Sequence, residues 1–311
     1  MTFEEFLKEW RSGSDVITAY TSGSTGTPKT IELDKEFVRL SGERTNSFFH
    51  IGKGSRLHSC VAADFIGGKM MAVRAEIAGG CLTWETPSNR PLQGIGKEER
   101  IDLLAVVPSQ MIHILEHLED MPKIGAILVG GSAINPVLRG RIAASGLNAY
   151  ETYGMTEASS HIALRKIGEN DEWFDTLPGI SVGLDSRGCL VIDFPGGERI
   201  VTNDLATLES STRFRIDGRY DHVIITGGKK VNPESVERKI AGLINGTYVV
   251  TSEPDEKWGS RVVLKIEGES GTGETDELLK GMKNVLDAWE VPKRIIYVER
   301  LERTPNGKIK R

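Results

Sequence analysis

The sequence of residues 101–129 is IDLLAVVPSQMIHILEHLEDMPKIGAILV, and two kinds of apolar pattern alternate along it. Leu103–Val107 and Ala126–Val129 are short, continuous apolar runs of the kind that form buried strands. Gln110–Leu118 lies between them and carries apolar residues at helical spacing. This order predicts two strands of one sheet that are joined by a crossover helix.

The same alternation extends to both sides, from residue 35 to residue 150. Further strands are predicted over Leu57–Ala62 and Cys81–Trp84, and further helices over Met70–Ala78 and Pro136–Ser145. We therefore expect an α/β fold in which helices cross over a sheet.

The first residues predict a short amphipathic helix and then a strand. Thr2 and Glu5 have the spacing of a capping box. Apolar residues recur behind them at helical spacing: Phe3, Phe6, Leu7 and Trp10. A strand is expected over Val16–Tyr20, and alternation resumes at Ile31–Leu33 after a loop of glycines and hydroxyl residues.

The pattern changes after residue 178, where short strands and Gly-rich turns follow one another up to residue 227. These strands are expected at Cys189–Phe194, Arg199–Thr202 and Val223–Ile225. We place the domain boundary near Gly218–Asp221, which gives a core domain at 1–217 and a smaller one at 218–311.

The smaller domain is expected to mix helices with strands. A helix begins at Asn232, and strands follow at 247–252, 261–267 and Ile295–Val298. A second helix is predicted over Leu278–Trp289, because its apolar residues form one stripe: Leu278, Leu279, Met282, Val285, Leu286 and Trp289.

Composition excludes several classes of protein. The chain has 311 residues, a formal net charge of −5 and a pI near 5.8, which argues against nucleic acid as its main partner. It contains no apolar run long enough to span a membrane. The N-terminus lacks the basic and apolar regions of a secretion signal. We expect a cytoplasmic protein.

Cysteines and histidines do not suggest a metal centre. The three cysteines are too few and too scattered for a disulfide framework or a metal cluster, and they suit a reducing compartment: Cys60, Cys81 and Cys189. His113 and His117 would share one helix face, but their spacing to Glu116 is not that of a zinc protease. We interpret this pair as part of a half-exposed helix.

Residues 20–29, YTSGSTGTPK, have the composition of a loop that binds a polyphosphate. Glycines let backbone N–H groups point inward, hydroxyls add donors and Lys29 adds a positive charge. Pro28 stands where the nucleoside-triphosphate loop of the Walker type has glycine, so this is a different loop. A flexible Ser/Gly linker is the alternative.

Three weaker motifs follow along the chain. Residues 150–157, YETYGMTE, combine an aromatic ring, a glycine and a Thr–Glu pair that suits Mg²⁺. Asp204, followed by Gly218–Asp221, could hold a ribose, or the second turn could be only a linker. Residues 305–311, PNGKIKR, are by default a basic, frayed terminus.

The order and spacing of these four motifs resemble one family, the adenylate-forming acyl-CoA synthetases. The phosphate loop matches residues 20–29, and the aromatic-Gly-x-Thr-Glu motif matches residues 153–157. The hinge and the segment after it match residues 214–237, and the motif with the catalytic lysine matches Pro305–Lys308. The resemblance covers nearly the whole chain.

This resemblance implies the fold and the site. The fold is an α/β adenylation domain that lacks most of its first subdomain, with a small mobile α+β domain after a hinge at Asp221. The implied catalytic residues are Lys308, Thr156 and Glu157, with Glu157 also the ligand of Mg²⁺. The implied ATP contacts are Thr21, Ser22, Gly23, Ser24, Thr25, Gly26, Lys29, Gly131, Ser132, Ala133, Tyr153, Gly154, Asp204 and Arg219.

Two departures from the family pattern bear on these expectations. About twenty residues precede the phosphate loop, where the family usually has well over a hundred. This leaves the acyl pocket and the oligomeric state open, including a homo-oligomer. The family's glycine before the ribose-binding aspartate is Asn203 here.

Within the family, the chain most resembles the o-succinylbenzoate–CoA ligases of menaquinone biosynthesis. Phe65 stands at the place of their histidine, and Arg74 at the place of an arginine linked to the acyl substrate, with Lys69 as a second candidate. The resemblance implies activation of o-succinylbenzoate by ATP and transfer to coenzyme A. A ligase for another acid and a non-catalytic nucleotide-binding protein are the alternatives.

Overall fold

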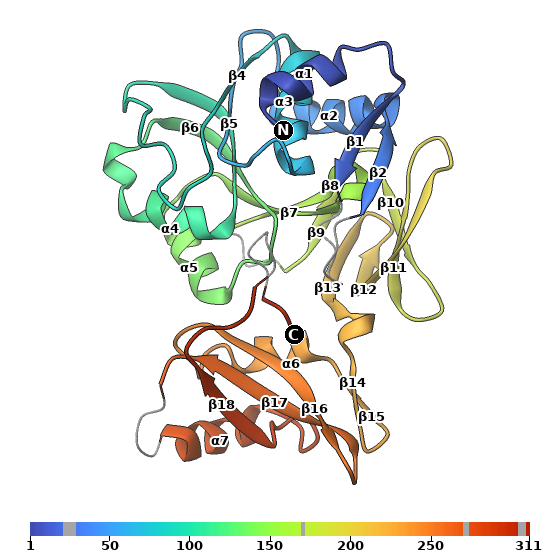
Figure 1. Cartoon of the computed structure of the whole chain (residues 1–311), viewed down its shortest axis with the longest axis vertical. Coiled ribbons are helices and arrows are strands. Elements are labelled where there is room, and N and C mark those ends of the chain that lie inside the picture. Colours follow the sequence, from blue (N-terminus) through green and yellow to red (C-terminus); the bar gives the residue numbers. More distant parts are fainter. Residues whose placement is uncertain (21–28, 169–171, 270–273, 304–308) are drawn as a thin grey trace. The chain divides into compact units, whose positions relative to one another are not determined.

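The computed structural model describes residues 1–20, 29–168, 172–269, 274–303 and 309–311. They form two compact units (Figure 1). The first consists of Met1–Ser181 and Asp193–Ile200, and the second of Val182–Ile192 and Val201–Arg311. The strands at 182–192 and 201–217 thus group with the C-terminal residues. The division at residue 218 remains a prediction.

A seven-stranded array organises the first unit, in the order β9-β8-β7-β6-β5-β3-β4. Its first five strands along the chain are parallel, and β8 and β9 are antiparallel. Their bounds are β3 Arg56–Ser59, β4 Cys81–Trp84, β5 Arg100–Val106, β6 Lys123–Val129, β7 Ala149–Met155, β8 Ser160–Lys166 and β9 Phe174–Thr176. The predicted α/β class is confirmed.

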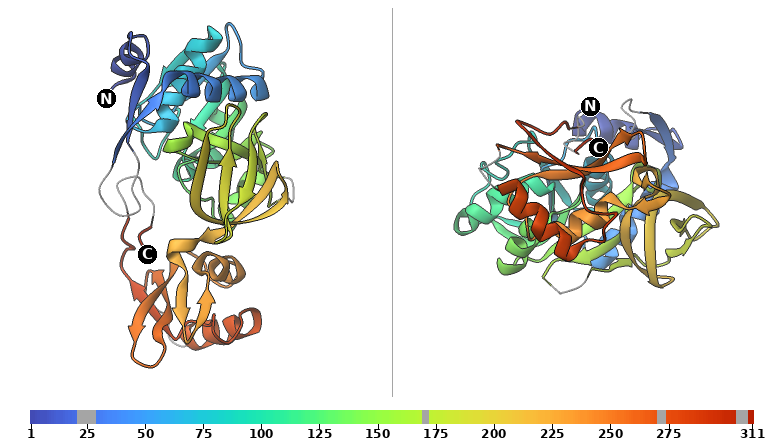
Figure 2. Two further views of the ribbon diagram at one scale, coloured as in Figure 1. Left: turned by 90° about the vertical axis from the view of Figure 1, so that its right-hand side faces the viewer. Right: turned by 90° about the horizontal axis from the view of Figure 1, so that it is seen from below.

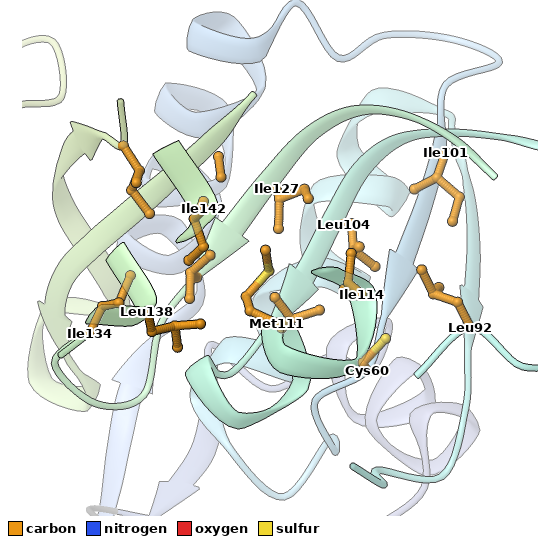
Figure 3. Packing of buried hydrophobic residues seen from close by; sticks show 14 residues of the cluster. Cys60, Leu92, Ile101, Leu104, Met111, Ile114, Ile127, Ile134, Leu138 and Ile142 are labelled. Atoms are coloured by element: carbon orange, nitrogen blue, oxygen red, sulfur yellow. The ribbon is translucent and has the colours of Figure 1, made fainter. Parts of the chain in front are cut away.

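Crossover helices cover this array. Helices α4 (Pro108–Glu116) and α5 (Pro136–Ala144) pack on β5 and β6 through one apolar cluster (Figure 3). Helices α2 (Lys35–Phe49) and α3 (Ile66–Ala78) pack on each other and contact β8. The short 3₁₀ turns η1 (Leu118–Asp120) and η2 (Thr156–Ala158) complete the unit.

The N-terminal segment packs on α3. Helix α1 (Phe3–Trp10) has the predicted capping box between Thr2 and Glu5. Strands β1 (Val16–Tyr20) and β2 (Thr30–Asp34) pair antiparallel, with Tyr20 opposite Thr30. Phe6 and Ile17 join a cluster that includes residues of α3.

The second unit joins most of a four-stranded sheet edge to a small α+β fold (Figure 2). The edge consists of β10 Ser181–Leu184, β11 Cys189–Asp193, β12 Arg199–Ser210 and β13 Arg213–Arg219, followed by η3 Tyr220–His222. The α+β fold consists of β14 Ile224–Thr226, β15 Lys229–Val231, α6 Pro233–Ile240, β16 Tyr248–Asp255, β17 Gly259–Glu267, α7 Glu274–Val285 and β18 Arg294–Val298. Its strands form a hairpin, β14-β15, and a sheet, β16-β17-β18.

Strands are longer than predicted where polar residues continue the backbone pairing between neighbouring strands. Strands β5 and β6 begin three residues early, since Arg100 pairs with Lys123 at the exposed edge. Strand β12 runs to Ser210 rather than Thr202, because β13 pairs with its polar half. Periodicity of apolar residues cannot report such extensions.

Helix α7 ends at Val285, so the prediction that it reaches Trp289 is wrong. Val285 and Trp289 are 45% and 43% exposed. The chain turns at Asp287, whose carbonyl accepts from the N–H groups of Glu290 and Val291. Val291 then enters the core in place of Trp289.

No helix of the described residues is both long and apolar enough to cross a membrane.

Candidate functional site

The predicted phosphate loop connects β1 to β2. Its residues Thr21–Gly26, with Thr27 and Pro28, lie outside the described residues. What the structure does show is the frame: the antiparallel β1–β2 pair carries both ends of the loop, and Lys29 is exposed beside Thr30. The phosphate-binding role of residues 21–29 remains a prediction.

The Thr–Glu motif lies against the start of this loop. Thr156, buried in η2, donates its hydroxyl to the carbonyl of Tyr20 at 3.4 Å. Glu157 is the next residue and is exposed. An exposed carboxylate beside a phosphate loop suits Mg²⁺, which takes few protein ligands and keeps oxygen ligands from water and phosphates. The residues present therefore fit the implied ion.

Gly154 is required by its own sheet. The register of β7 and β8 shifts between Tyr153 and Gly154, and a Cβ on Gly154 would stand 1.9 Å from the carbonyl oxygen of Ser160. Ser159 and Ser160 both have positive φ, 54° and 90°. The backbone that approaches Gly154 closely is therefore that of β8, and a contact between Gly154 and ATP remains a prediction.

The other predicted adenine contacts lie around the ends of β6 and β7. The ring of Tyr153 lies 5.8 Å from that of Phe174 between centroids. Residues 131–133 form an exposed loop after β6, in which Gly131 has a φ of 88°. The role of Gly131, Ser132 and Ala133 in binding adenine remains a prediction.

Sequence reasoning missed the residue that anchors this loop, Glu151. It is 5% exposed, forms ion pairs with Arg139 and with Arg165 (2.7 Å), and accepts from the N–H of Ile134 at 3.4 Å. A charged residue at a buried position is costly unless it is paired. Its place within the motif strand was the available signal.

The predicted ribose residues come together in the second unit. Asp204 on β12 pairs in register with Arg219 on β13, and the two side chains lie 3.3 Å apart. Arg219 also donates two hydrogen bonds to Asp221, the predicted hinge residue. The hydrogen bonds from Arg219 hold the pKa of Asp221 below its ordinary value. Their roles toward ATP remain predictions.

Arg74 is buried on α3 without an acidic partner among the described residues. It is 1% exposed, and one terminal nitrogen lies 3.5 Å from Nδ1 of His161 on β8. Its Nε has no hydrogen-bond partner in the part of the chain that the structure describes. Burial lowers the pKa of its guanidinium to about 9, which leaves it charged at neutral pH.

His161 is held neutral. The hydroxyl of Thr45 donates to the carbonyl of Ser41 at 3.3 Å, so its oxygen accepts from Nε2–H of His161 at 3.0 Å. Nδ1 then carries the lone pair that faces Arg74. Burial first, and then the charge of Arg74, lower the pKa of His161 well below its ordinary value.

Lys69 and Phe65, the other predicted acyl contacts, have different surroundings. Lys69 is fully buried against α1, with its Nζ 4.6 Å from the centre of the Phe6 ring and 3.9 Å from Glu9. Through these contacts Lys69 helps to hold α1 against α3. Phe65 is 41% exposed at the start of α3.

Lys308 lies outside the described residues, but the two ends of its segment are held. Arg303 pairs with Ile309 in an antiparallel bridge. Arg311 donates two hydrogen bonds to Glu237 on α6, at 2.6 and 2.8 Å, and it contacts Glu234 at 3.2 Å. Residues 309–311 are therefore anchored, which corrects the default interpretation of a frayed terminus.

Comparisons with known proteins agree with this architecture. The AMP-binding enzyme family matches residues 7–200. A 2-succinylbenzoate–CoA ligase of Listeria monocytogenes is 28% identical over 99% of this chain and 71% of its own length. A feruloyl-CoA synthase of an Amycolatopsis species is 27% identical over 94% of this chain and 68% of its own.

Solved structures show the same fold. An AMP-forming acyl-CoA synthetase/AMP-acid ligase II-like protein of Dyadobacter fermentans is 32% identical, with a TM-score of 0.65 over 99% of this chain and 91% of that one. The o-succinylbenzoate–CoA synthetase of Bacillus subtilis, solved with an acyl-adenylate, has a TM-score of 0.80 at 21% identity, over 94% and 67%. The family model matches more than half of the chain and the solved structures share its fold, so the chain belongs to the AMP-binding enzyme family.

Proposed function

We propose that this protein is an ATP-dependent acid–CoA ligase that activates o-succinylbenzoate. In the first half-reaction, a carboxylate oxygen of the acid attacks the α-phosphorus of ATP and pyrophosphate leaves, which gives an acyl-adenylate. In the second, the thiol of coenzyme A attacks the acyl carbon and AMP leaves. The product would serve menaquinone biosynthesis.

The residues divide the work of the first step. Attack of one anion on another needs positive charge that is already oriented. We assign this to Lys308, which would bridge the attacking and α-phosphate oxygens. The 21–29 loop would hold the β- and γ-phosphates. Mg²⁺ held through Glu157 would neutralise phosphate charge, and Asp204 and Arg219 would hold the ribose.

Arg74 is the observation that supports the choice of acid. o-Succinylbenzoate carries two carboxylates, and only one is activated, so the second needs a partner. A buried guanidinium that no described carboxylate neutralises suits that anion, because unpaired buried charges are costly on both sides. Lys69 is the weaker candidate, because Glu9 and the Phe6 ring already surround it.

Relatives of similar identity act on other acids by name, among them feruloyl-CoA synthases and an indoleacetate–CoA ligase. A ligase for an aromatic monocarboxylic acid is therefore the second candidate function. It would use the same ATP site and would not need Arg74 as a counter-charge.

Pyrophosphate exchange into ATP separates these functions. The full chain is incubated with ATP, labelled pyrophosphate and one acid at a time: o-succinylbenzoate, ferulate, indoleacetate, benzoate and a medium-chain fatty acid. We expect the highest kcat/KM for o-succinylbenzoate. Exchange with ferulate or a fatty acid and none with o-succinylbenzoate would support the second candidate. Absence of exchange with every acid would leave a nucleotide-binding protein without activity.

A further inference from the structure

Three metal-ligating side chains meet at the ends of two neighbouring parallel strands, away from the ATP motifs in sequence. They are His58, Cys60 and Glu85, and their ligand atoms all lie within 4.8 Å of one another. His58 lies on β3, and Cys60 and Glu85 directly follow β3 and β4. None of them belongs to the motifs that are predicted above to bind ATP or the acid.

The strand register brings them together. His58 lies opposite Thr83 in the parallel pair of β3 and β4. Side chains two residues apart on a strand share a face, so Cys60 follows His58 and Glu85 follows Thr83 on the same side. The N–H of Glu85 donates to the carbonyl of Ser59 at 3.3 Å, which continues this register.

Hydrogen bonds orient the histidine ring with its free nitrogen toward the other two groups. The hydroxyl of Thr83 donates to the carbonyl of Leu57 at 3.3 Å, so its oxygen accepts from Nδ1–H of His58 at 2.8 Å. Nε2 then carries a lone pair. A metal-binding histidine typically has its other nitrogen fixed in this way.

That lone pair has no partner. His58 is 2% exposed, and its Nε2 makes no hydrogen bond within the described residues. The closest charged atom is Oε2 of Glu85 at 3.7 Å, which is also an acceptor. Two acceptors that face each other at a buried place are unfavourable unless a proton on the nitrogen or a metal ion lies between them.

The surroundings fix the other two ligands. The carboxylate of Glu85 accepts from the N–H of Leu92, at 3.0 and 3.2 Å. The carbonyl of Cys60 accepts from the side-chain amide of Gln110 at 3.0 Å. Cys60 is 1% exposed, whereas the Glu85 side chain is 22% exposed. The group is therefore closed on the protein side and open to water beside Glu85.

We propose that His58 Nε2, Cys60 Sγ and a Glu85 carboxylate oxygen bind one divalent transition-metal ion of the zinc class. One nitrogen, one sulfur and one oxygen ligand suit Zn²⁺, with water at the fourth position. The thiol proton passes to solvent when Sγ binds the ion. Zinc bonds of about 2.0–2.3 Å place tetrahedral ligands about 3.3–3.8 Å apart, so the group closes on the ion by small side-chain rotations.

The ion would hold the edge of the sheet together. It would link β3 to the segment of residues 85–92, whose two ends are already joined by the hydrogen bond from the N–H of Leu92 to Glu85. This site is separate from the Mg²⁺ expected at Glu157, and it does not depend on the proposed ligase function.

The experiment uses the full chain without a histidine tag, freed of metal by a chelator and titrated with Co²⁺ and then Zn²⁺. We expect one equivalent of Co²⁺ to produce a thiolate charge-transfer absorption, and Zn²⁺ to abolish it and raise the melting temperature. Cys60→Ser should lose the absorption. Cys81→Ser, which changes the exposed cysteine of β4, is the matched control and should keep it.

Two further variants guard against misfolding. Glu85→Gln keeps the shape of the side chain and should weaken metal binding at least tenfold. Thr83→Val removes the hydroxyl that accepts from Nδ1–H of His58 and donates to the carbonyl of Leu57. It should weaken binding about 10–100-fold with the absorption retained. Circular dichroism of the metal-free variants checks that they fold.

The proposal is overturned if the metal-free chain binds no equivalent of metal at micromolar concentration, or if Cys60→Ser binds as the parent does. It is also overturned if binding disappears only when His113 and His117 are replaced. Their rings lie 4.1 Å apart at the C-terminal end of α4, where two close imidazoles offer a second place for a metal ion among the described residues.

Discussion

Arg219 binds Asp221 with two hydrogen bonds, at 2.9 and 2.8 Å, while its remaining terminal nitrogen lies 3.3 Å from Asp204. One guanidinium thus connects the two aspartates at which the sequence predicts ribose binding and domain rotation. A change at the predicted hinge would therefore reach the predicted ribose site through a single side chain.

Arg219→Lys should raise the KM for ATP about tenfold, since a lysine cannot contact both carboxylates through a planar fork. The measurement is pyrophosphate exchange at varied ATP. Arg199→Lys is the control, because Arg199 is exposed and pairs with Asp193 rather than with Asp204 or Asp221. A KM within twofold of the parent would contradict the assignment of Arg219 to the ribose.

Arg74→Ala should reduce kcat/KM for o-succinylbenzoate by about 10–100-fold, in line with the loss of a charged hydrogen bond of about 1.5–3 kcal/mol. The KM for ATP should hardly change. Lys69→Met is the comparison, because it keeps the buried volume beside Phe6 and removes the other candidate cation. A larger loss in Lys69→Met than in Arg74→Ala would reverse the assignment.

Lys308→Ala should slow adenylation by about 10²–10³-fold, as expected for the loss of an oriented charge in the transition state. Thioester formation from pre-made acyl-adenylate should survive, because the domain rotation that the family resemblance implies would move Lys308 away before the thiol enters. The two half-reactions are assayed separately. Equal losses in both would refute the domain-rotation mechanism.

Glu157→Gln should raise the Mg²⁺ concentration needed for half-maximal rate, since an amide oxygen is a weaker ligand for a hard cation than a carboxylate. The rate at saturating Mg²⁺ should recover in large part. An unchanged Mg²⁺ dependence would exclude Glu157 as the ligand.

The neutral state of His161 predicts a pH dependence of stability. Its pKa is lower in the folded chain than the ordinary 6.5, so below pH 6.5 the unfolded chain binds one more proton and stability falls as pH falls. His161→Gln removes this dependence. The difference in free energy of unfolding between the parent and the His161→Gln variant should therefore shrink by about 1.4 kcal/mol from pH 7.5 to pH 5.5. Denaturant unfolding at both pH values measures it, and a constant difference would contradict a neutral His161.

Local sequence was sufficient for much of the fold. Val16–Tyr20 and Cys81–Trp84 were predicted at the bounds of β1 and β4, because short apolar runs between turn residues have few alternatives. The capping box of Thr2 and Glu5 spans only four residues, the N-cap and the first three residues of the helix. Helix α7 was predicted too long, because a stripe of apolar residues does not show where tertiary packing turns the chain.

The candidate site divides in the same way. The sequence by itself determined the family's motifs and their order, since each consists of residues that are neighbours in the chain. Which side chains meet across the fold depended on strand register, and this is why His58, Cys60 and Glu85 gave no metal signal in sequence.

Lys69 and Arg74 show the physical reason most directly. Both are cations on α3, five residues apart, and both are almost completely buried. The sequence treated them as alternatives for one role. Lys69 packs against Glu9 and Phe6 of α1, whereas Arg74 faces the neutral His161 of β8. Burial costs a cation its hydration, and only the tertiary structure decides whether the protein itself supplies the compensating partner.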